Sequence, residues 1–205
     1  MPKLFWWLIG LSLLGLAYRV SQPGPLFPPS PIPQAAGQVI APDPPVQRLI
    51  PQASPQTYLD LELQPLAEFE FDARLLSLAW YSQGTEAKYS PVDIGIAWGA
   101  MSDSANVDAL DWSHGSRFLN YRYASQPPIP QHELDRLIAN LHVLPASENV
   151  LRKIEQLRPG QRIVGRGILV AATREDGWRW NSSLSREDTG AGACELLLLS
   201  DIRVR

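Results

Sequence analysis

Proline is the residue that most limits what this chain can fold into. Of the 19 prolines in the 205-residue sequence, 12 lie between Pro23 and Pro65. Because proline fixes φ and has no amide hydrogen to donate, neither a regular helix nor a central strand is expected there. We therefore predict a proline-rich spacer over residues 21–65, in polyproline II or disordered conformation. Residues 66–205 are predicted to form a single folded domain, a length sufficient for one hydrophobic core.

The spacer has two interpretations. An extended proline-rich chain would act as a stalk that holds the folded domain away from the N-terminal segment. Alternatively, Pro28 to Pro31 match the P-x-x-P pattern that proline-reading partners recognise. Such short matches are common in proline-rich sequence, so the stalk is the favoured interpretation.

The N-terminal segment is strongly apolar. No charged residue lies between Leu4 and Tyr18, and Lys3 and Arg19 flank this run. As a helix it would be about 22 Å long, and snorkelling of the two flanking side chains would bring it closer to the ~30 Å of a hydrocarbon core. We predict an N-terminal transmembrane helix over residues 1–20 that anchors the chain in the membrane. A cleaved signal peptide is the alternative, although no small-residue cleavage site follows the run.

The flanking charges predict an orientation. The amino terminus and Lys3 together carry more positive charge than Arg19, which favours a cytoplasmic N-terminus under the positive-inside rule. The predicted location is therefore a bacterial inner membrane, crossed once, with the folded domain in the periplasm. The expected partners are the membrane, through the N-terminal helix, and a protein of the cell envelope.

Composition excludes several classes of site and partner. The net charge of −3 and the 19% of charged residues argue against a strongly basic nucleic-acid binder, so nucleic acid is not an expected partner. A single cysteine excludes multi-cysteine zinc and iron–sulfur sites, and three histidines leave little material for another metal centre. No metal and no cofactor are therefore predicted.

Hydrophobic periodicity places the elements of the domain. Apolar residues alternate with polar ones, or form short β-rich runs, over residues 69–75, 92–98, 118–123, 161–173, 178–183 and 193–204. Helical spacing covers Gln131 to Asn140, and Ser147 caps a second short helix that Pro159 follows. Gly165 and Gly167 mark a bulge or sharp bend in the long strand.

This order of elements predicts an α+β, mostly β fold. We predict a small OB-like, partly open β-barrel with a helical insertion ahead of the last three strands, preceded by the transmembrane helix. An irregular α+β sandwich is the alternative architecture.

Two short motifs have simpler explanations than catalysis or metal binding. Asp188 to Ala191 read D-T-G-A, as in retropepsin-like aspartic proteases, but the residues before them are polar where that family has an apolar strand. A β-turn explains these letters. Asp103 to Asp108 suggest a calcium loop, but the glycine at position six and the glutamate at position twelve are missing. We therefore predict a loop and a helix cap there.

Trp178 and Trp180 are the most suggestive aromatic pair. Alternation places both on one face of a strand and Arg179 on the other. Aromatic side chains beside arginine can stack on the bases of a single strand, which gives a single-stranded nucleic-acid-binding OB-like domain as one alternative function. The acidic net charge disfavours it, and tryptophans of the core are the preferred interpretation.

Three segments together resemble a known family. They are the S-P-V-D and W-G-A-M-S-D motifs within residues 90–103, N-L-H-V-L-P-A over residues 140–146, and the D-G-W-R-W-N-S-S-L-S-R motif that continues to Cys194 and Glu195. The chain is similar over Phe69 to Val204 to a bacterial family of membrane-anchored proteins. The resemblance implies a membrane-tethered bacterial protein and supplies no activity. Ala100 and Leu141 depart from the pattern without removing a polar group.

The predicted function is a noncatalytic binding or assembly module on the outer side of the membrane, with a ligand that the sequence does not identify. An alternative is a hydrolase-type enzyme with a polar site built from residues 90–103, 140–146 and 176–195. No residue is assigned a catalytic role. The candidate ligand-binding residues are Asp93, Trp98, Asp103, Arg117, His142, Trp178, Trp180, Ser182, Arg186 and Glu195.

Overall fold

The computed structural model describes residues 2–20, 22–185 and 194–205 of the chain. Its strands are β1 (Val46–Leu49), β2 (Gln56–Tyr58), β3 (Leu61–Trp80), β4 (Val92–Ala97), β5 (Asp111–Gly115), β6 (Phe118–Arg122), β7 (Ile138–Pro145), β8 (Arg162–Thr173), β9 (Arg179–Asn181) and β10 (Glu195–Val204). Its α-helices are α1 (Pro2–Val20), α2 (Ser104–Val107), α3 (Gln131–Leu134) and α4 (Glu148–Glu155). Single 3₁₀ turns cover Glu86–Lys88, Gly99–Ser102 and Asp135–Leu137.

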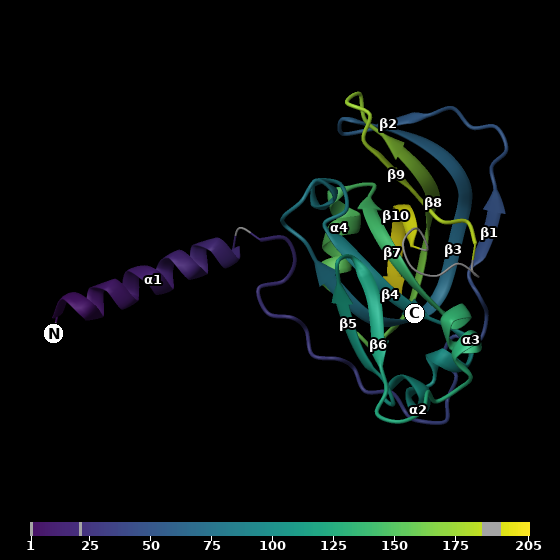
Figure 1. The fold of residues 1–205 in the computed structure, drawn as a ribbon, viewed down its shortest axis with the longest axis horizontal. Coiled ribbons are helices and arrows are strands. Elements are labelled where there is room, and N and C mark those ends of the chain that lie inside the picture. Colours follow the sequence, from purple (N-terminus) through teal and green to yellow (C-terminus); the bar gives the residue numbers. More distant parts are fainter. Residues whose placement is uncertain (1, 21, 186–193) are drawn as a thin grey trace.

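A mostly β fold is confirmed, but the partly open OB-like barrel is a wrong prediction. Within the described residues, the main sheet closes into a ring in which β3 pairs with β4, β4 with β7, β7 with β10, β10 with β8, and β8 again with β3 (Figure 1). The β7–β10 pair is parallel and the other pairs of the ring are antiparallel. The ring closes because β3 is 20 residues long and uses both of its edges.

Glycines allow the strands of the ring to cross closely. A Cβ atom at Gly165 would lie 2.2 Å from the ring of Phe71, and one at Gly167 would lie 2.2 Å from the carbonyl oxygen of Leu198. No residue with a side chain fits these two positions without displacing a neighbour. Strand β8 stays in register with β3 through both glycines, and the register shift in its pairing with β10 lies between Leu199 and Asp201 of β10.

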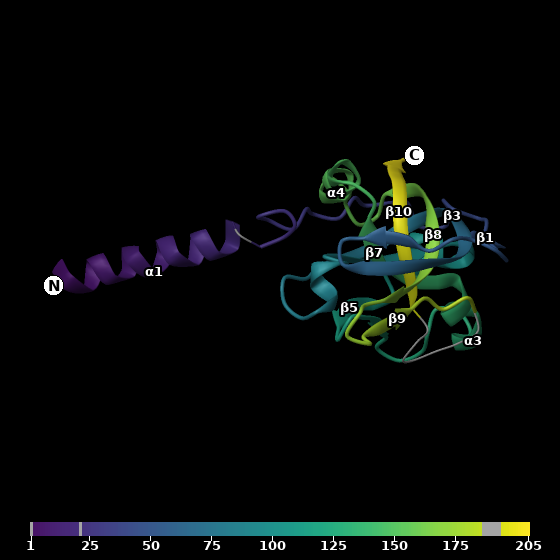
Figure 2. The same ribbon diagram turned by 90° about the horizontal axis from the view of Figure 1, so that it is seen from above.

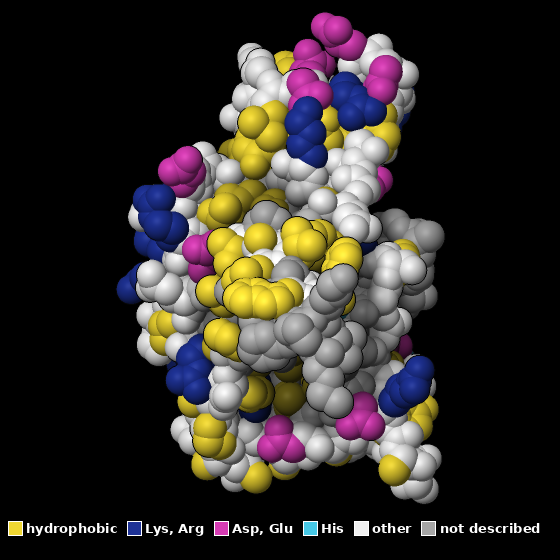
Figure 3. All heavy atoms as spheres, turned by 90° about the vertical axis from the view of Figure 1, so that its left-hand side faces the viewer, with side chains coloured by type: hydrophobic (Ala, Val, Ile, Leu, Met, Phe, Trp, Pro, Cys, Tyr) yellow, Lys and Arg dark blue, Asp and Glu magenta, His cyan; other side chains and the backbone are white. Residues whose placement is uncertain are grey.

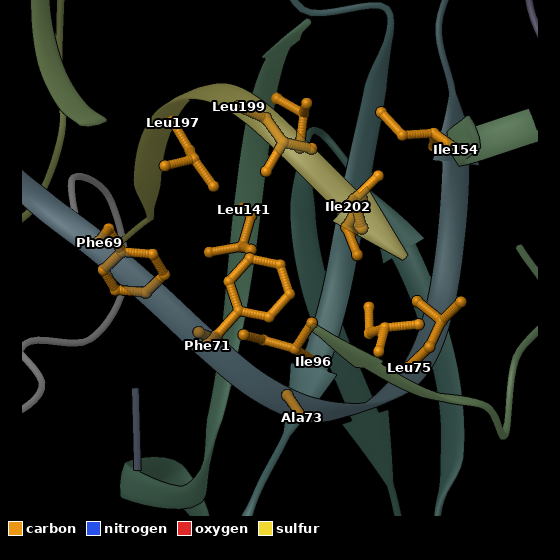
Figure 4. Packing of buried hydrophobic residues seen from close by; sticks show 14 of the residues in the cluster. Phe69, Phe71, Ala73, Leu75, Ile96, Leu141, Ile154, Leu197, Leu199 and Ile202 are labelled. Atoms are coloured by element: carbon orange, nitrogen blue, oxygen red, sulfur yellow. The ribbon is translucent and has the colours of Figure 1, made fainter. Parts of the chain in front are cut away.

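The main core fills the inside of the ring. Phe69, Phe71 and Leu75 alternate along β3 and are at most 2% exposed. Figure 4 shows them with side chains from β4, β7 and β10 in the space that the ring encloses. The short helix α4 packs Ile154 onto this core, and the Ser147 hydroxyl accepts a hydrogen bond from the Val150 amide at 3.3 Å, as the predicted cap requires.

One predicted helix ends earlier than expected and runs into a strand that the sequence did not predict. The helix predicted from Gln131 to Asn140 ends in the turns of α3 and Asp135–Leu137, and β7 begins at Ile138. Along β7, Leu141 and Val143 point into the ring, while Asn140 and His142 lie on the outer face. The apolar residues of this short stretch fit both the helical period and the strand period of two. Pairing with β4 and β10 stabilises the strand.

The prediction of a transmembrane helix is wrong. Within the described part of the chain, no helix is both long enough and apolar enough to span a membrane. Only 15 uncharged residues separate Lys3 from Arg19, and these reach about 22 Å as a helix, less than the ~30 Å of a hydrocarbon core. Helix α1 extends away from the sheet (Figures 1 and 2), and Figure 3 looks along it at its exposed apolar side chains. Trp7 and Leu14 are among the exposed residues of this helix.

The proline-rich segment lies along the folded domain (Figure 1). The Ile32 amide of this segment donates a hydrogen bond to the carbonyl of Pro159 at 2.7 Å. The carbonyl of Ala41 accepts a hydrogen bond from the Gly99 amide at 2.8 Å. Further along, β1 and β2 pair with β3, and β3 itself begins at Leu61. The predicted domain boundary at residue 66 therefore falls inside a strand of the ring.

Candidate functional site

The centre of the candidate site is a pair of polar residues on the outer face of the ring. Asp93 of β4 and His142 of β7 are register partners, because their strands are antiparallel neighbours. Their apolar neighbours face the core, so alternation places both on the outer face. Asp93 is 0% exposed, and its Oδ1 accepts a hydrogen bond from Nδ1 of His142 at 2.9 Å.

Arg117 reaches this pair from the hairpin of β5 and β6. Ser116 and Arg117 form the turn, and both have positive φ, 51° and 66°. This conformation matches the twist of a two-residue hairpin but is uncommon for residues other than glycine, asparagine and aspartate. From the turn, the Arg117 guanidinium donates to Asp93 Oδ1 at 2.6 Å and to the hydroxyl of Ser90 at 2.8 Å. The carboxylate thus holds one cation and one imidazole at a single oxygen.

Aromatic rings enclose the guanidinium. Its central carbon lies 4.3 Å from the ring centroid of Tyr81 and 5.2 Å from that of Trp180. The Trp180 ring also lies 4.9 Å from the imidazole of His142, and Trp178 packs against it edge-on at 6.1 Å. Cation–π contacts and exclusion of water both strengthen the Arg117–Asp93 ion pair.

These side chains lie at the wall of a hollow of about 610 Å³. This volume is within the range of small-molecule sites. Among the described residues, Nε2 of His142 makes no hydrogen bond, so this atom is available to a ligand in the hollow. The lining residues are Glu86, Ser116, Arg117, Phe118, His142, Arg179, Trp180, Asn181 and Cys194.

Burial sets the protonation of two neighbouring groups. Burial lowers the pKa of His114, Asp93 raises it, and the neighbouring His142 and Arg117 lower it further. Its Nε2 lies 2.8 Å from the hydroxyl of Ser77, so a neutral imidazole is held beside the site. Burial, with help from Asp93, raises the pKa of Tyr81, so this phenol stays protonated.

Cys194 is a poor nucleophile in this setting. Burial raises the pKa of its thiol, and the amide of Asn140, which donates to Sγ at 3.5 Å, lowers it only in part. The same amide donates to the backbone carbonyl of Arg117 at 2.8 Å. Asn140 therefore fixes the hairpin turn, and the thiol remains in its neutral, weakly nucleophilic form.

Four of the predicted ligand-binding residues lie together, namely Asp93, Arg117, His142 and Trp180, and Trp178 packs beside them. They come from β4, the β5–β6 turn, β7 and β9. The family-like segments and the alternation in residues 178–180 placed Asp93, His142, Trp178 and Trp180 in the prediction, whereas Arg117 lies outside those segments.

The other predicted residues have different places. Trp98 is 2% exposed in the core of the ring. Asp103 caps α2, accepting from the amides of Ala105 at 2.9 Å and Gly37 at 2.8 Å. The Ser182 hydroxyl accepts from the amide of Leu196 at 3.0 Å and so secures the start of β10.

Glu195, the first residue of β10, is 4% exposed and is the register partner of Leu141. It therefore lies beside the site and does not line the hollow. Arg186 lies outside the described residues, as do the D-T-G-A letters of residues 188–191.

Several residues of the site were not among the predicted ligand-binding residues: Tyr81, Ser90, His114, Ser116, Asn140 and Cys194. A period of two over residues 138–145 would have placed Asn140 and His142 on one strand face. The turn at Ser116 had no such signal, since its two central residues are not those that favour positive φ.

Comparisons with protein-family models, with curated proteins and with solved structures found no match to this chain. The resemblance to a membrane-anchored bacterial family stays a prediction. Within the described residues, no group of three or more histidine, cysteine, aspartate or glutamate side chains is arranged to hold a metal ion. The geometry of the site is therefore what supports a function.

Proposed function

We propose that this chain is a noncatalytic binding module and that the hollow beside Trp180 is its ligand site. The observation that carries the proposal is that Arg117 and His142, both held by the buried Asp93, line a hollow of ligand size. A fixed cluster of this kind presents the outer edges of His142 and Arg117 in one orientation. Pre-organised polar groups beside an apolar wall are typical of small-molecule sites.

The lining residues favour a small acidic ligand with a planar ring. Trp180 and Phe118 offer apolar faces on which a ring can pack. Arg117 and Arg179 offer nitrogen donors, whereas Glu86 is the single acid among the lining residues of the described chain. A carboxylate would therefore find donors on more than one side of the hollow.

A panel of aromatic carboxylates and the matching aromatic amines tests the proposal by thermal shift of the full chain. The carboxylates are expected to raise Tm with concentration, because a ligand that binds only the folded state stabilises it. The amines are expected to have no such effect. Stabilisation by the amines alone, or by no compound, contradicts the proposal.

Arg179→Ala tests whether the carboxylate binds in this hollow, and Arg166→Ala is its matched control. Both arginines are exposed on neighbouring strands, but only Arg179 lines this hollow. Losing one charged hydrogen bond costs about 1 kcal/mol, so Arg179→Ala is expected to weaken carboxylate binding roughly fivefold. Arg166→Ala is expected to leave it unchanged. Equal effects of the two variants would place the ligand elsewhere.

A hydrolase-type enzyme is the second candidate, and the Asp93–His142 hydrogen bond is what favours it. A carboxylate on Nδ1 orients imidazole as a general base in many hydrolases. The described residues, however, supply no activated nucleophile, because the thiol of Cys194 has a raised pKa and the Ser182 hydroxyl secures β10. Turnover of an ester or peptide that disappears in Cys194→Ser would favour the enzyme over the binding module.

Single-stranded nucleic-acid binding has less support. Trp178 packs against Tyr89 and Trp180, so it offers little free surface on which a second base could stack. The net charge of −3 also disfavours contact with a phosphate backbone. A periplasmic location and a partner in the cell envelope stay predictions, which fractionation of cells that express the full chain would test.

A further inference from the structure

The segment from Pro23 to Pro33 packs on a second surface, which shares no lining residue with the hollow beside Trp180. Its prolines line a cavity of about 260 Å³ together with Leu78, Trp80 and Pro159. Leu78 and Trp80 come from the end of β3, and Pro159 lies just before β8. The segment itself has neither helix nor strand conformation, in keeping with its prolines.

An indole supports one end of this segment. A Cβ atom at residue 24 would lie 2.4 Å from the Trp80 ring, so the backbone of Gly24 rests directly on the indole face. Gly24 has a φ of +90°, which glycine adopts without strain. Flat aromatic surfaces of this kind are what proline-rich strands dock against in known recognition modes.

Hydrogen bonds hold the other end. The Ile32 amide donates to the carbonyl of Pro159 at 2.7 Å, and Nε of Arg158 donates to the carbonyl of Ser30 at 2.9 Å. A Cβ atom at Gly160 would lie only 2.0 Å from the carbonyl oxygen of Ile32, so the segment approaches the backbone of Gly160 closely. A polyproline II strand has no internal hydrogen bonds, so the surface beneath it must supply partners, and here it supplies two.

The resident segment uses this surface incompletely. The cavity of about 260 Å³ beside Trp80 is not filled by the chain's own prolines. Two apolar side chains of the segment, Leu26 and Phe27, are 45% and 84% exposed instead. A strand with an apolar side chain directed into the cavity would bury more surface than the resident does.

We propose that Leu78, Trp80 and residues 158–160 form a proline-binding surface for a partner protein, which supplies a proline-rich strand in polyproline II conformation. Residues 23–33 are then a resident competitor that the partner displaces. A second copy of this chain would leave the same cavity unfilled, which favours a different sequence as the occupant. This proposal is independent of the hollow beside Trp180.

The probe is a fluorescein-labelled peptide with the sequence of residues 22–34, titrated into the full chain and followed by anisotropy. The released variant carries Gly24→Val, which places atoms on the indole, and Ile32→Pro, which removes the donor to Pro159. It is expected to bind the peptide at least roughly tenfold more tightly than the unchanged chain, because a tethered competitor acts at a high effective concentration. Adding Trp80→Ala to the released variant is expected to abolish this binding.

Phe27→Ala is the matched control within the segment. Phe27 is 84% exposed, so its removal leaves the resident segment in place and the peptide affinity at the level of the unchanged chain. The proposal is overturned if the released variant does not bind the peptide, or binds it equally well without Trp80. A released variant that dimerises through its own segment contradicts the assignment to a partner and favours a second copy.

A second measurement does not depend on destabilised variants. In the unchanged, ¹⁵N-labelled chain, an excess of unlabelled peptide is expected to speed hydrogen exchange at the Ile32 amide, which loses its acceptor when the segment is displaced. The amide of Leu75, which donates to the carbonyl of Gln161 within the domain, is the reference and is expected to stay unchanged. Unchanged exchange at Ile32 under saturating peptide contradicts the proposal.

Discussion

At the residue scale, the fully buried carboxylate of Asp93 is the group on which the site depends. It is 0% exposed and accepts from both Arg117 and His142 at one oxygen. Removal of one partner from a buried ion pair leaves the other charge without compensation. The cluster therefore contributes to stability as well as to binding, and the two roles are separable by mutation.

Asp93→Asn is expected to lower the free energy of unfolding by about 3–5 kcal/mol, because the side chain of Arg117 is only 16% exposed and loses its counterion. Urea unfolding measures the change. Asp60→Asn is the control, since Asp60 pairs with Lys88 at 2.6 Å but both side chains are about half exposed. That variant is expected to leave stability nearly unchanged, and an equal loss in both would contradict a special role for Asp93.

His114 is expected to make the fold sensitive to acid. Burial lowers its pKa in the folded chain, so below the unfolded value of about 6.5 the unfolded chain takes up the proton more readily. The free energy of unfolding should therefore be highest above that pH and fall as the pH drops through it. His114→Gln, which keeps a partner for Ser77, should weaken this dependence in urea titrations at about pH 7.5 and about pH 5.5. An unaltered dependence would exclude His114 as its source.

At the element scale, β8 must pass close to β3 for the ring to close. Gly165→Ala places a Cβ 2.2 Å from the ring of Phe71 and is expected to cost about 1–3 kcal/mol through overpacking. Gly115→Ala is the matched control on β5, where the nearest atom to a new Cβ lies 3.7 Å away. Thermal unfolding of both variants measures the difference. Equal Tm values would show that the crossing tolerates a side chain.

The elements differ in how well the sequence predicts them. The alternation along β3 and the capped helix α4 are each determined by local chemistry, and the sequence predicts both. Strand β7 was missed because its short apolar run fits two periods, and pairing with distant strands decides between them. Closure of the ring likewise depends on contacts between residues far apart in sequence.

The same distinction applies to the candidate site. Asp93 and His142 were both predicted, but their register across β4 and β7 required the strand that was missed. Arg117 reaches them from a turn with positive φ at two residues that seldom adopt it, so no local pattern indicates its direction. Tertiary contacts therefore assemble the site from residues that the sequence identifies only singly.

At the scale of the whole molecule, the proline-rich segment is part of the folded surface. Composition correctly indicated that it lacks helix, but composition says nothing about what lies beneath it. Backbone groups at Ile32, Gly37 and Ala41 each hydrogen-bond to the domain. These hydrogen bonds fix the path of the backbone from Ile32 to Ala41, which has neither helix nor strand conformation.

Asp103→Ala is expected to weaken the attachment of the proline-rich segment to the domain at Gly37. Its Oδ1 accepts from the amides of Gly37 and Ala105, and hydrogen bonds from the backbone, that of Ala105 first, lower the pKa of Asp103. Without the carboxylate, the Gly37 amide should exchange faster in hydrogen–deuterium exchange. Asp111→Ala on the exposed edge of β5 is the control and should leave that amide unchanged. No acceleration in Asp103→Ala would mean that other contacts hold the segment.

The central claim is that the hollow walled by Arg117, His142 and Trp180 is a ligand site. The most direct measurement is a ¹H–¹⁵N titration of the full chain with an aromatic carboxylate, with the Trp180 indole signal assigned by Trp180→Phe. The account predicts a saturable shift of that indole, because its ring forms a wall of the hollow. A saturable shift confined to indoles elsewhere, or no saturable shift with any carboxylate of the panel, would contradict it.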